Sequence, residues 1–274
     1  MITKDTAEPK LEFAGASPYD RYVKASVLTA LQEPWSEDPA EMAFLVTTQV
    51  MELWFTLLVH EWRTARDALA QDRAQDALAA LRRSLPQLTA LNASWTPIAS
   101  LTPGQFNSYR AALGEGSGFQ SAMYRHLEFL LGDKSASLLQ PHRGVPRVHA
   151  ELEAALHSPS LYDAVLAHLA RQGFEVPAEV LERDLSQRYE PHPGVEAVWT
   201  RIYADPRHEK LVELGEALTD VAELVGRWRT DHLLATRRAM GSKQGTGGSA
   251  GVAWLEKRAN KIVFPELWTA RSYV

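Results

Sequence analysis

Histidine offers this 274-residue sequence its best means of holding a metal, because the chain contains nine histidines and no cysteine. The absence of cysteine excludes disulfides, thiolate metal ligands, iron–sulfur clusters and cysteine nucleophiles. His232 continues an apolar stripe of the longest expected helix, where a charged imidazole would be unfavourable. Two interpretations stay open. Spacing alone favours a core histidine bonded to a neighbour, whereas a neutral imidazole in an apolar wall also suits the axial ligand of a heme iron.

The other histidines carry weaker signals. No HExxH, His-x-His or acid–His pair accompanies His232, which disfavours zinc and non-heme iron. We expect His60, His126 and His168, which fall on helical segments, to be structural. We expect solvated side chains for the histidines near Pro-rich boundaries, namely His142, His149, His157, His192 and His208.

Two further features could bind an anionic substrate. Arg110 follows Phe106 by one helical turn, so a guanidinium could clamp a carboxylate while the ring packs an apolar group. The alternative, which spacing alone favours, is a surface arginine lying over its neighbour. The segment GTGGSAG at 245–251 could bind an anion through backbone N–H groups. It is not a P-loop, and its composition suits a flexible linker and a ligand-closing lid equally well.

Helical periodicity dominates the segments that must position these residues. The first helix is expected from about Pro18 to Leu31, the second from near Pro39 towards Leu69, and a third, more exposed helix over 74–92. The second is apolar on more than one side, which is typical of the central helix of a bundle. The longest helix is expected over 207–240, closed by Gly241.

Capping signals and prolines divide the rest of the chain. Capping boxes at Thr102–Gln105 and Ser117–Gln120 predict helices over 103–113 and 118–131, joined by a Gly-rich elbow. Seven prolines interrupt the region 140–206, which indicates short helices that form an excursion without a core of their own. The sequence therefore predicts an all-α helical bundle, with residues 1–274 in a single domain.

Composition narrows the class of protein. Hydrophobic residues make up 45% of the chain and charged residues 23%, and the net charge is −5. A negative chain without clustered Lys and Arg disfavours nucleic acid as a partner. No run approaches eighteen apolar residues and the N-terminus lacks an apolar signal core, so we expect no membrane span and a cytoplasmic protein.

Several segments in family order, spanning nearly the whole chain, resemble the tryptophan 2,3-dioxygenase superfamily of heme-dependent aromatic oxygenases. They comprise Tyr19 to Tyr22 (YDRY), Glu41 to Phe44 (EMAF) with Gln49 to Phe55 (QVMELWF), Ser117 to Arg125 (SGFQSAMYR) with Glu128 to Gly132 (EFLLG), and Trp228 to His232 (WRTDH) followed by Gly245 to Ser249 (GTGGS). The resemblance implies the helical bundle of that family and of the related indoleamine dioxygenases, with heme b as cofactor and O2 as co-substrate.

The resemblance also implies roles for individual residues. His232 would be the proximal heme ligand, and Trp95, Ser117 and Gly118 would lie beside the heme. Phe44 and Phe106 would contact the substrate's indole, Arg110 would hold its carboxylate, and Thr246 would close over its ammonium and carboxylate. Tyr19 and Tyr22, in an N-terminal arm of about 34 residues, would reach the pocket of a neighbouring subunit, as the family's homotetramer requires.

The sequence departs from the family at the distal position of the HQ-x-x-ELW motif, where Thr48 replaces a histidine that bonds the indole N–H. Threonine is too short to replace imidazole and cannot act as a base near neutral pH. The altered site resembles the superfamily branch that forms 2-oxindoles in natural-product pathways, such as the enzyme of maremycin biosynthesis, which acts on β-methyltryptophan.

The expected activity is therefore oxygen insertion at the indole C2–C3 bond of tryptophan or a substituted tryptophan, with Thr48 at the catalytic position. We lean to monooxygenation to a 2-oxindole over dioxygenation to N-formylkynurenine. A non-catalytic heme-binding module and a purely structural bundle are the alternatives from other classes.

Overall fold

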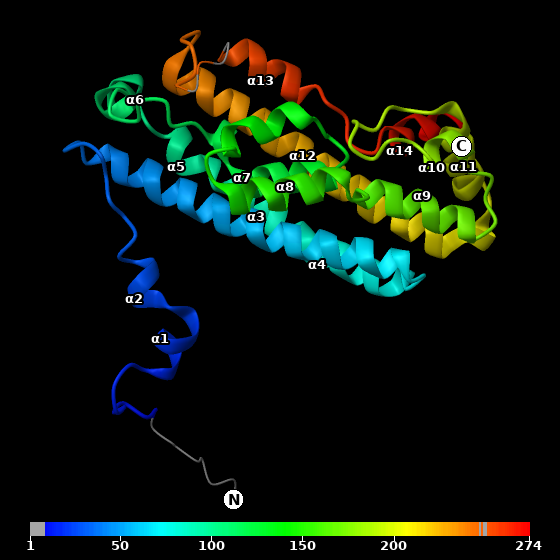
Figure 1. Cartoon of the computed structure of the whole chain (residues 1–274), viewed down its shortest axis with the longest axis horizontal. Coiled ribbons are helices and arrows are strands. Elements are labelled where there is room, and N and C mark those ends of the chain that lie inside the picture. The colour runs from blue at the N-terminus through cyan, green and yellow to red at the C-terminus, as the bar shows by residue number, and fades with distance from the viewer. Residues whose placement is uncertain (1–8, 247, 249–250) are drawn as a thin grey trace, which may run out of the picture.

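Two long helices, α3 (Ala40–Ala70) and α12 (Glu209–Met240), run along the molecule, and α4 (Ala74–Ala93) packs against both of them (Figure 1). The computed structural model describes residues 9–246, 248 and 251–274. No strand occurs within these residues, and the all-α prediction is confirmed. The second and longest predicted helices agree with α3 and α12 to within two residues.

Apolar stripes and a few polar contacts hold the three helices together. Trp62 of α3 is fully buried, and its indole Nε1 donates a hydrogen bond of 3.1 Å to the Ser84 hydroxyl of α4. Asn92 of α4 donates through Nδ2 to the Leu224 carbonyl of α12 at 3.2 Å. The helix predicted over 74–92 is present as α4, which buries one face, including Leu81, and exposes the other.

The first predicted helix, 18–31, is split, and this corrects the expectation from the sequence. It forms α1 (Pro18–Val23) and α2 (Ala25–Leu28), separated by Lys24 in the left-handed region at φ 59°. The Asp20 carboxylate accepts hydrogen bonds from the Ser26 amide and hydroxyl, which stabilises the turn. Neither short helix buries a residue, and the arm extends away from the bundle (Figure 1).

The two capping boxes are present, but they bound shorter helices than predicted. The Thr102 box opens α6 (Pro103–Arg110), which follows α5 (Trp95–Ala99). The Ser117 box opens only a 3-10 turn, η1 (Gly118–Gln120). A second cap follows at Ser121, whose hydroxyl accepts a hydrogen bond from the Tyr124 amide, and the helix α7 (Ala122–Leu130) begins there. At the elbow, a Cβ on Gly116 would lie 2.9 Å from the Leu113 carbonyl oxygen, so a larger residue would displace backbone.

The region 140–206 consists of short helices, as the prolines predict. These are η2 (Ala136–His142), α8 (Pro146–His157), α9 (Leu161–Arg171), α10 (Ala178–Leu181) and α11 (Pro193–Ala204), with η3 (Pro206–His208) leading into α12. Val165 and Trp199 belong to the same apolar core as Trp62, so α9 and α11 complete the main core. A smaller cluster gathers Leu152 and Leu156 of α8 against Phe129.

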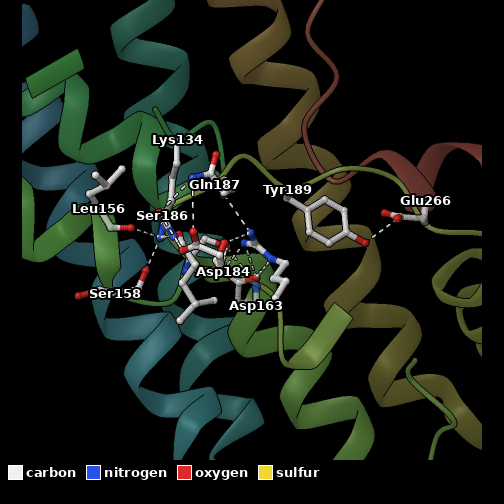
Figure 2. A network of polar contacts seen from close by, with 12 residues as sticks. Lys134, Leu156, Ser158, Asp163, Asp184, Ser186, Gln187, Tyr189 and Glu266 are labelled. Atoms are coloured by element: carbon white, nitrogen blue, oxygen red, sulfur yellow. Dashed lines mark hydrogen bonds and ion pairs between the residues drawn. The ribbon is translucent and has the colours of Figure 1, made fainter. Parts of the chain in front are cut away.

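Buried polar groups fasten this excursion to the bundle (Figure 2). The Lys134 ammonium is almost fully buried and donates to the backbone carbonyls of Leu156, Ser158 and Leu185. Tyr189 donates to the Glu266 carboxylate at 2.6 Å, which ties the excursion to the C-terminal segment. That segment comprises α13 (Val252–Ala259), α14 (Pro265–Thr269) and η4 (Ala270–Tyr273).

Within the described residues, α3 is long and apolar enough to cross a membrane by length and composition. This is weak evidence for a membrane span, because the central helix of a bundle meets the same criterion. The helix buries Leu58, Trp62 and Leu69 in the bundle core, as a central helix does.

Candidate active site

A cavity between α3, α5, α6, α12 and α13 encloses about 1480 Å³ of space, including its opening to solvent. Its walls bring together eight of the predicted site residues from segments far apart in the chain: Phe44, Thr48, Trp95, Phe106, Ser117, Gly118, His232 and Thr246. Apolar side chains form most of the wall, as in sites that take a flat, hydrophobic group.

His232 is the group in this wall best suited to hold a metal. Its imidazole stacks on the Trp95 indole, with ring centroids 4.5 Å apart and planes 12° from parallel. No hydrogen bond joins the ring to any described residue. Burial in the apolar wall lowers the pKa of His232 to about 4, so the imidazole is neutral at physiological pH and a nitrogen lone pair remains to bind a metal.

Other histidines have structural partners. Arg63 donates to Nδ1 of His126 at 3.0 Å, and His168 lies 2.8 Å from the Asp72 carboxylate. The expectation of a solvated His142 is wrong, because this side chain is 7% exposed at the end of η2. His192 is only half-exposed, and its Nδ1 accepts from the Gly194 amide at the start of α11.

An aromatic group forms one end of the cavity. Phe44 of α3 lies edge-on to Phe106 of α6, with ring centroids 6.2 Å apart, and both rings contact Tyr109. Thr48 follows Phe44 by one turn, and its hydroxyl donates to the Phe44 carbonyl at 2.8 Å. With its proton committed to that carbonyl, Thr48 can only accept a hydrogen bond from a molecule in the cavity.

Arg110 does not line the cavity. Its guanidinium donates to the backbone carbonyl of Gln244, directly before the glycine-rich loop 245–251. Thr246 of that loop donates to the Gly116 carbonyl at 2.6 Å, and Lys243, just before the loop, donates to Asn107 at 2.9 Å. The loop therefore lies over the α6 end of the cavity as a lid would. Its residues 247, 249 and 250 lie outside the described part of the chain.

Tyr19 and Tyr22 lie far from the cavity of their own chain. They are 69% and 90% exposed on the projecting arm. The structure thus leaves both tyrosines free to contact another molecule, and a role in a neighbouring pocket stays a prediction.

Sequence reasoning missed a charged part of the wall. Arg125, Arg229 and Arg258 line the cavity, together with Glu52 and Trp254. Burial raises the pKa of the Glu52 carboxyl. Arg125 and Arg229 lie inside motifs that resemble the superfamily, and Arg229 precedes His232 by three residues, which places it on the same helix face. Arg258 and Trp254 lie in a segment that carries no comparable signal.

Heme suits this cavity better than a metal held by protein ligands alone. No three His, Asp or Glu side chains converge on one point among the described residues. A single neutral imidazole can still ligate an iron that a porphyrin already coordinates, and the Trp95 and Trp228 indoles in the wall offer apolar contact. The fold and the site thus define a helical protein with a pocket for heme.

Comparison with known proteins identifies the family. The family model described as tryptophan 2,3-dioxygenase matches residues 3–204 and 200–274. Tryptophan 2,3-dioxygenase 1 of Ralstonia nicotianae is 39% identical over 97% of this chain and 90% of its own length. The tryptophan 2,3-dioxygenases of Ralstonia pickettii and of a Bradyrhizobium species are 38% and 40% identical, each over 97% of this chain and 96% of their own length.

The chain belongs to the tryptophan 2,3-dioxygenase family, and the resemblance drawn from its motifs is confirmed at this level. Membership also confirms the prediction of a heme-dependent tryptophan oxygenase. These relatives match the dioxygenase alternative, and none of them supports the preference for 2-oxindole formation.

Proposed function

We propose that this enzyme is a tryptophan 2,3-dioxygenase, which inserts both atoms of O2 at the indole C2–C3 bond of L-tryptophan and forms N-formylkynurenine. One observation carries the proposal: a neutral, unbonded imidazole and the aromatic slot face one cavity, in a chain that matches enzymes of that name along 97% of its length. The heme would be heme b, because a chain without cysteine cannot form the thioether links of a c-type heme.

The bound heme supplies the activation of O2, and the protein positions the substrate. His232 would hold the iron from the α12 side. Phe44 and Phe106 would pack against the indole, and Arg110 would turn from the Gln244 carbonyl to the substrate carboxylate. Thr246 would then fasten the loop over the amino-acid end, so that water is excluded from the cavity.

Thr48 supports binding of an indole N–H without serving as a base. Its hydroxyl proton is held by the Phe44 carbonyl, so its lone pairs suit a donor such as an N–H group or a bridging water. A water between Thr48 and the indole would make up for the shorter side chain. This arrangement is compatible with dioxygenation, because the indole nitrogen keeps an acceptor nearby.

A second candidate function is monooxygenation of tryptophan or β-methyltryptophan to a 2-oxindole. Thr48 favours it, because a hydroxyl at the distal position holds the indole less firmly than an imidazole would and leaves room for a bulkier substrate.

Product mass separates these two functions. We expect reduced, heme-loaded enzyme supplied with tryptophan and O2 to yield a product heavier by two oxygen atoms, both labelled when 18O2 is used. A gain of one oxygen, from tryptophan or from β-methyltryptophan, would replace the dioxygenase proposal with the second function. No gain from either substrate would indicate a heme-binding module.

The Thr48→His variant tests the role of the distal position. An imidazole can bond the indole N–H directly, so the variant should bind tryptophan more tightly and still form N-formylkynurenine. The measurement is the tryptophan affinity of the heme-loaded enzyme, with Thr89→His on the exposed side of α4 as the control, because Thr89 also donates to the carbonyl one turn before it. An unchanged affinity would remove Thr48 from the proposed catalytic site.

We further propose that the enzyme is a homotetramer. Five apolar side chains lie exposed along one stripe of α3: Met42, Val46, Val50, Leu53 and Leu57. The projecting arm adds exposed Tyr19, Tyr22 and Trp35. Contiguous apolar surface of this kind is typical of a subunit interface. An arm that reaches across it would bring Tyr19 and Tyr22 towards the cavity of a neighbouring copy.

A further inference from the structure

Glu52 brings a carboxyl group into the α3 wall of the cavity. The side chains that α3 contributes to this wall recur at helical spacing: Phe44, Thr48, Met51, Glu52 and Phe55. Glu52 follows Thr48 by one turn, so the two side chains are neighbours on the same face of the helix. An acid therefore lies beside the distal residue of the proposed site.

The geometry of an α-helix directs the Glu52 side chain towards Thr48. Each Cα–Cβ bond is tilted towards the N-terminus of the helix, so a long side chain covers the turn that precedes its own Cα. The Cα atoms of the two residues are about 6 Å apart along the helix axis. The glutamate carboxyl, carried on two methylene groups, extends over this turn, whereas the threonine hydroxyl is attached to Cβ and stays close to the helix.

The Glu52 carboxyl has no cationic partner. The side chain is half-buried, and no ion pair joins it to a described residue. Burial raises the pKa of the Glu52 carboxyl, and the hydroxyl of Ser121, which also lines the cavity, offsets this rise only in part. Partial removal of a carboxyl from water without a counter-charge is unfavourable, and such groups in cavities are typical of ligand-binding sites.

Ser121 orients the Glu52 carboxyl. The Ser121 hydroxyl is the cap of α7 and accepts a hydrogen bond of 3.0 Å from the Tyr124 amide. The proton of that hydroxyl is therefore left to donate to one oxygen of Glu52. The second carboxyl oxygen receives no hydrogen bond from a described residue, so it is available to accept one from a molecule in the cavity.

We propose that Glu52 and Thr48 together hold one water molecule that accepts the hydrogen bond of the indole N–H, so that Glu52 is a positioning residue for the substrate. The Thr48 hydroxyl gives its proton to the Phe44 carbonyl, so both side chains face the water as acceptors. A water molecule can donate one proton to each of them and still accept the indole N–H. This inference rests on the proposed function and names the second group that holds the water beside Thr48.

Such a water gives the site selectivity for an indole that carries an N–H group. Two acceptors fix the direction of both water protons, so a lone pair of the water points at the indole nitrogen. An isostere without the N–H would leave that lone pair unpaired in a largely apolar cavity, which is unfavourable. Loss of either acceptor would let the water rotate, so the selectivity is expected to depend on Glu52 as well as on Thr48.

The test compares tryptophan with its benzothiophene analogue, in which a sulfur atom replaces the indole N–H. The dissociation constant of each ligand is read from the change in the heme spectrum of the heme-loaded enzyme. We expect the wild-type enzyme to bind tryptophan roughly tenfold more tightly than the analogue, as loss of one hydrogen bond predicts. Glu52→Leu should remove most of this preference by weakening tryptophan binding alone. Glu52→Gln keeps an acceptor oxygen and should retain most of the preference.

Further variants separate this role from a structural one. Glu153→Leu, on an exposed glutamate of α8, is the matched control and should behave like the wild type. Thr48→Val and Glu52→Leu should each disturb the same water, so the double variant should lose no more of the preference than either single variant. The Glu52→Leu protein should melt no lower than the wild type, because it no longer buries a carboxyl without a counter-charge.

Equal affinity of the wild-type enzyme for the two ligands would overturn the proposal, as would equal weakening of both ligands by Glu52→Leu. A Glu52→Gln variant as impaired as Glu52→Leu would contradict the acceptor role, and additive losses in the double variant would contradict a shared water. These outcomes would leave the proposed dioxygenase intact, because tryptophan would still bind and be converted. Failure of the wild-type enzyme to bind tryptophan would overturn the proposed function, and this inference with it.

Discussion

At the scale of single residues, the proposed chemistry depends on one imidazole kept neutral by burial. His232 has a pKa of about 4, stacks on Trp95, and offers a nitrogen to the cavity without competition from a described hydrogen-bond partner. A protonated ring could not bind iron, so desolvation prepares the ligand.

Removal of this imidazole gives the first prediction. His232→Ala should lose the Soret spectrum of a histidine-ligated heme, or bind heme far more weakly, because no other imidazole lines the described cavity wall. Titration of heme into the purified variant measures this. His157→Ala, exposed at the end of α8, is the matched control and should match wild type. An identical spectrum in His232→Ala would place the heme elsewhere.

Arg110 gives a second prediction at the same scale. Arg110→Ala should weaken tryptophan binding by roughly 2–5 kcal/mol, because the substrate carboxylate would be buried without a cation. The measurement is tryptophan affinity of the heme-loaded enzyme, read from the change in the heme spectrum. Arg143→Ala, exposed beyond η2, provides the control. Unchanged affinity would show that Arg110 serves only to hold the loop through Gln244.

At the scale of helices, polar contacts between elements decide how the bundle responds to pH. His126 of α7 is 6% exposed and accepts a hydrogen bond from Arg63 of α3. Burial, reinforced by the Arg63 charge, lowers the pKa of His126 from 6.5 to about 4. The folded state therefore holds this ring neutral at a pH where the unfolded chain protonates it.

The third prediction follows from that difference in pKa. Above pH 6.5 the His126 ring is neutral in both the folded and the unfolded state. As the pH falls from 6.5 to 4, the ring becomes protonated in the unfolded state but stays neutral in the folded state, so the free energy of unfolding decreases. His126 should therefore cost on the order of 1–3 kcal/mol of stability across this window. Urea unfolding at pH 7 and pH 4.5 measures it. His126→Gln should lose less stability than wild type between these pH values, while an equal loss would contradict the assignment.

At the scale of the whole molecule, the exposed surface and the projecting arm indicate assembly. Leu53 is 56% exposed in the middle of the apolar α3 stripe, and the arm has no buried residue in α1 or α2. Exposing this apolar surface to water is unfavourable for a single chain, whereas a second copy of the chain would bury it.

The fourth prediction tests that assembly. Leu53→Glu places a charge in the middle of the stripe and should convert the proposed tetramer to smaller species, because burying the carboxylate in an interface is unfavourable. Light scattering coupled to size-exclusion chromatography reports the mass. Leu181→Glu, on an exposed leucine of α10 away from the stripe, should leave the mass unchanged. A wild-type mass that equals one chain would refute the tetramer.

The amino-acid sequence by itself determined where the long helices lie and which of their residues face the core. Apolar periodicity predicted α3 and α12 within two residues, and the stripe on α12 placed His232 in line with buried Val225 and Trp228. Helix periodicity is a property of neighbours in the chain, so it can be read without knowledge of the rest of the fold. Together with the motif resemblance, it located eight residues of the cavity wall.

Only the tertiary structure decided which distant groups meet. Arg125, Arg229 and Arg258 come from three helices, and nothing in their spacing indicates that they share two buried carboxylates. Arg110 turns to the Gln244 carbonyl because the fold brings two distant segments together. The break between α1 and α2 follows from the left-handed backbone of one residue, Lys24. Burial, ion pairing and charge balance depend on which segments pack together, and local patterns do not specify that.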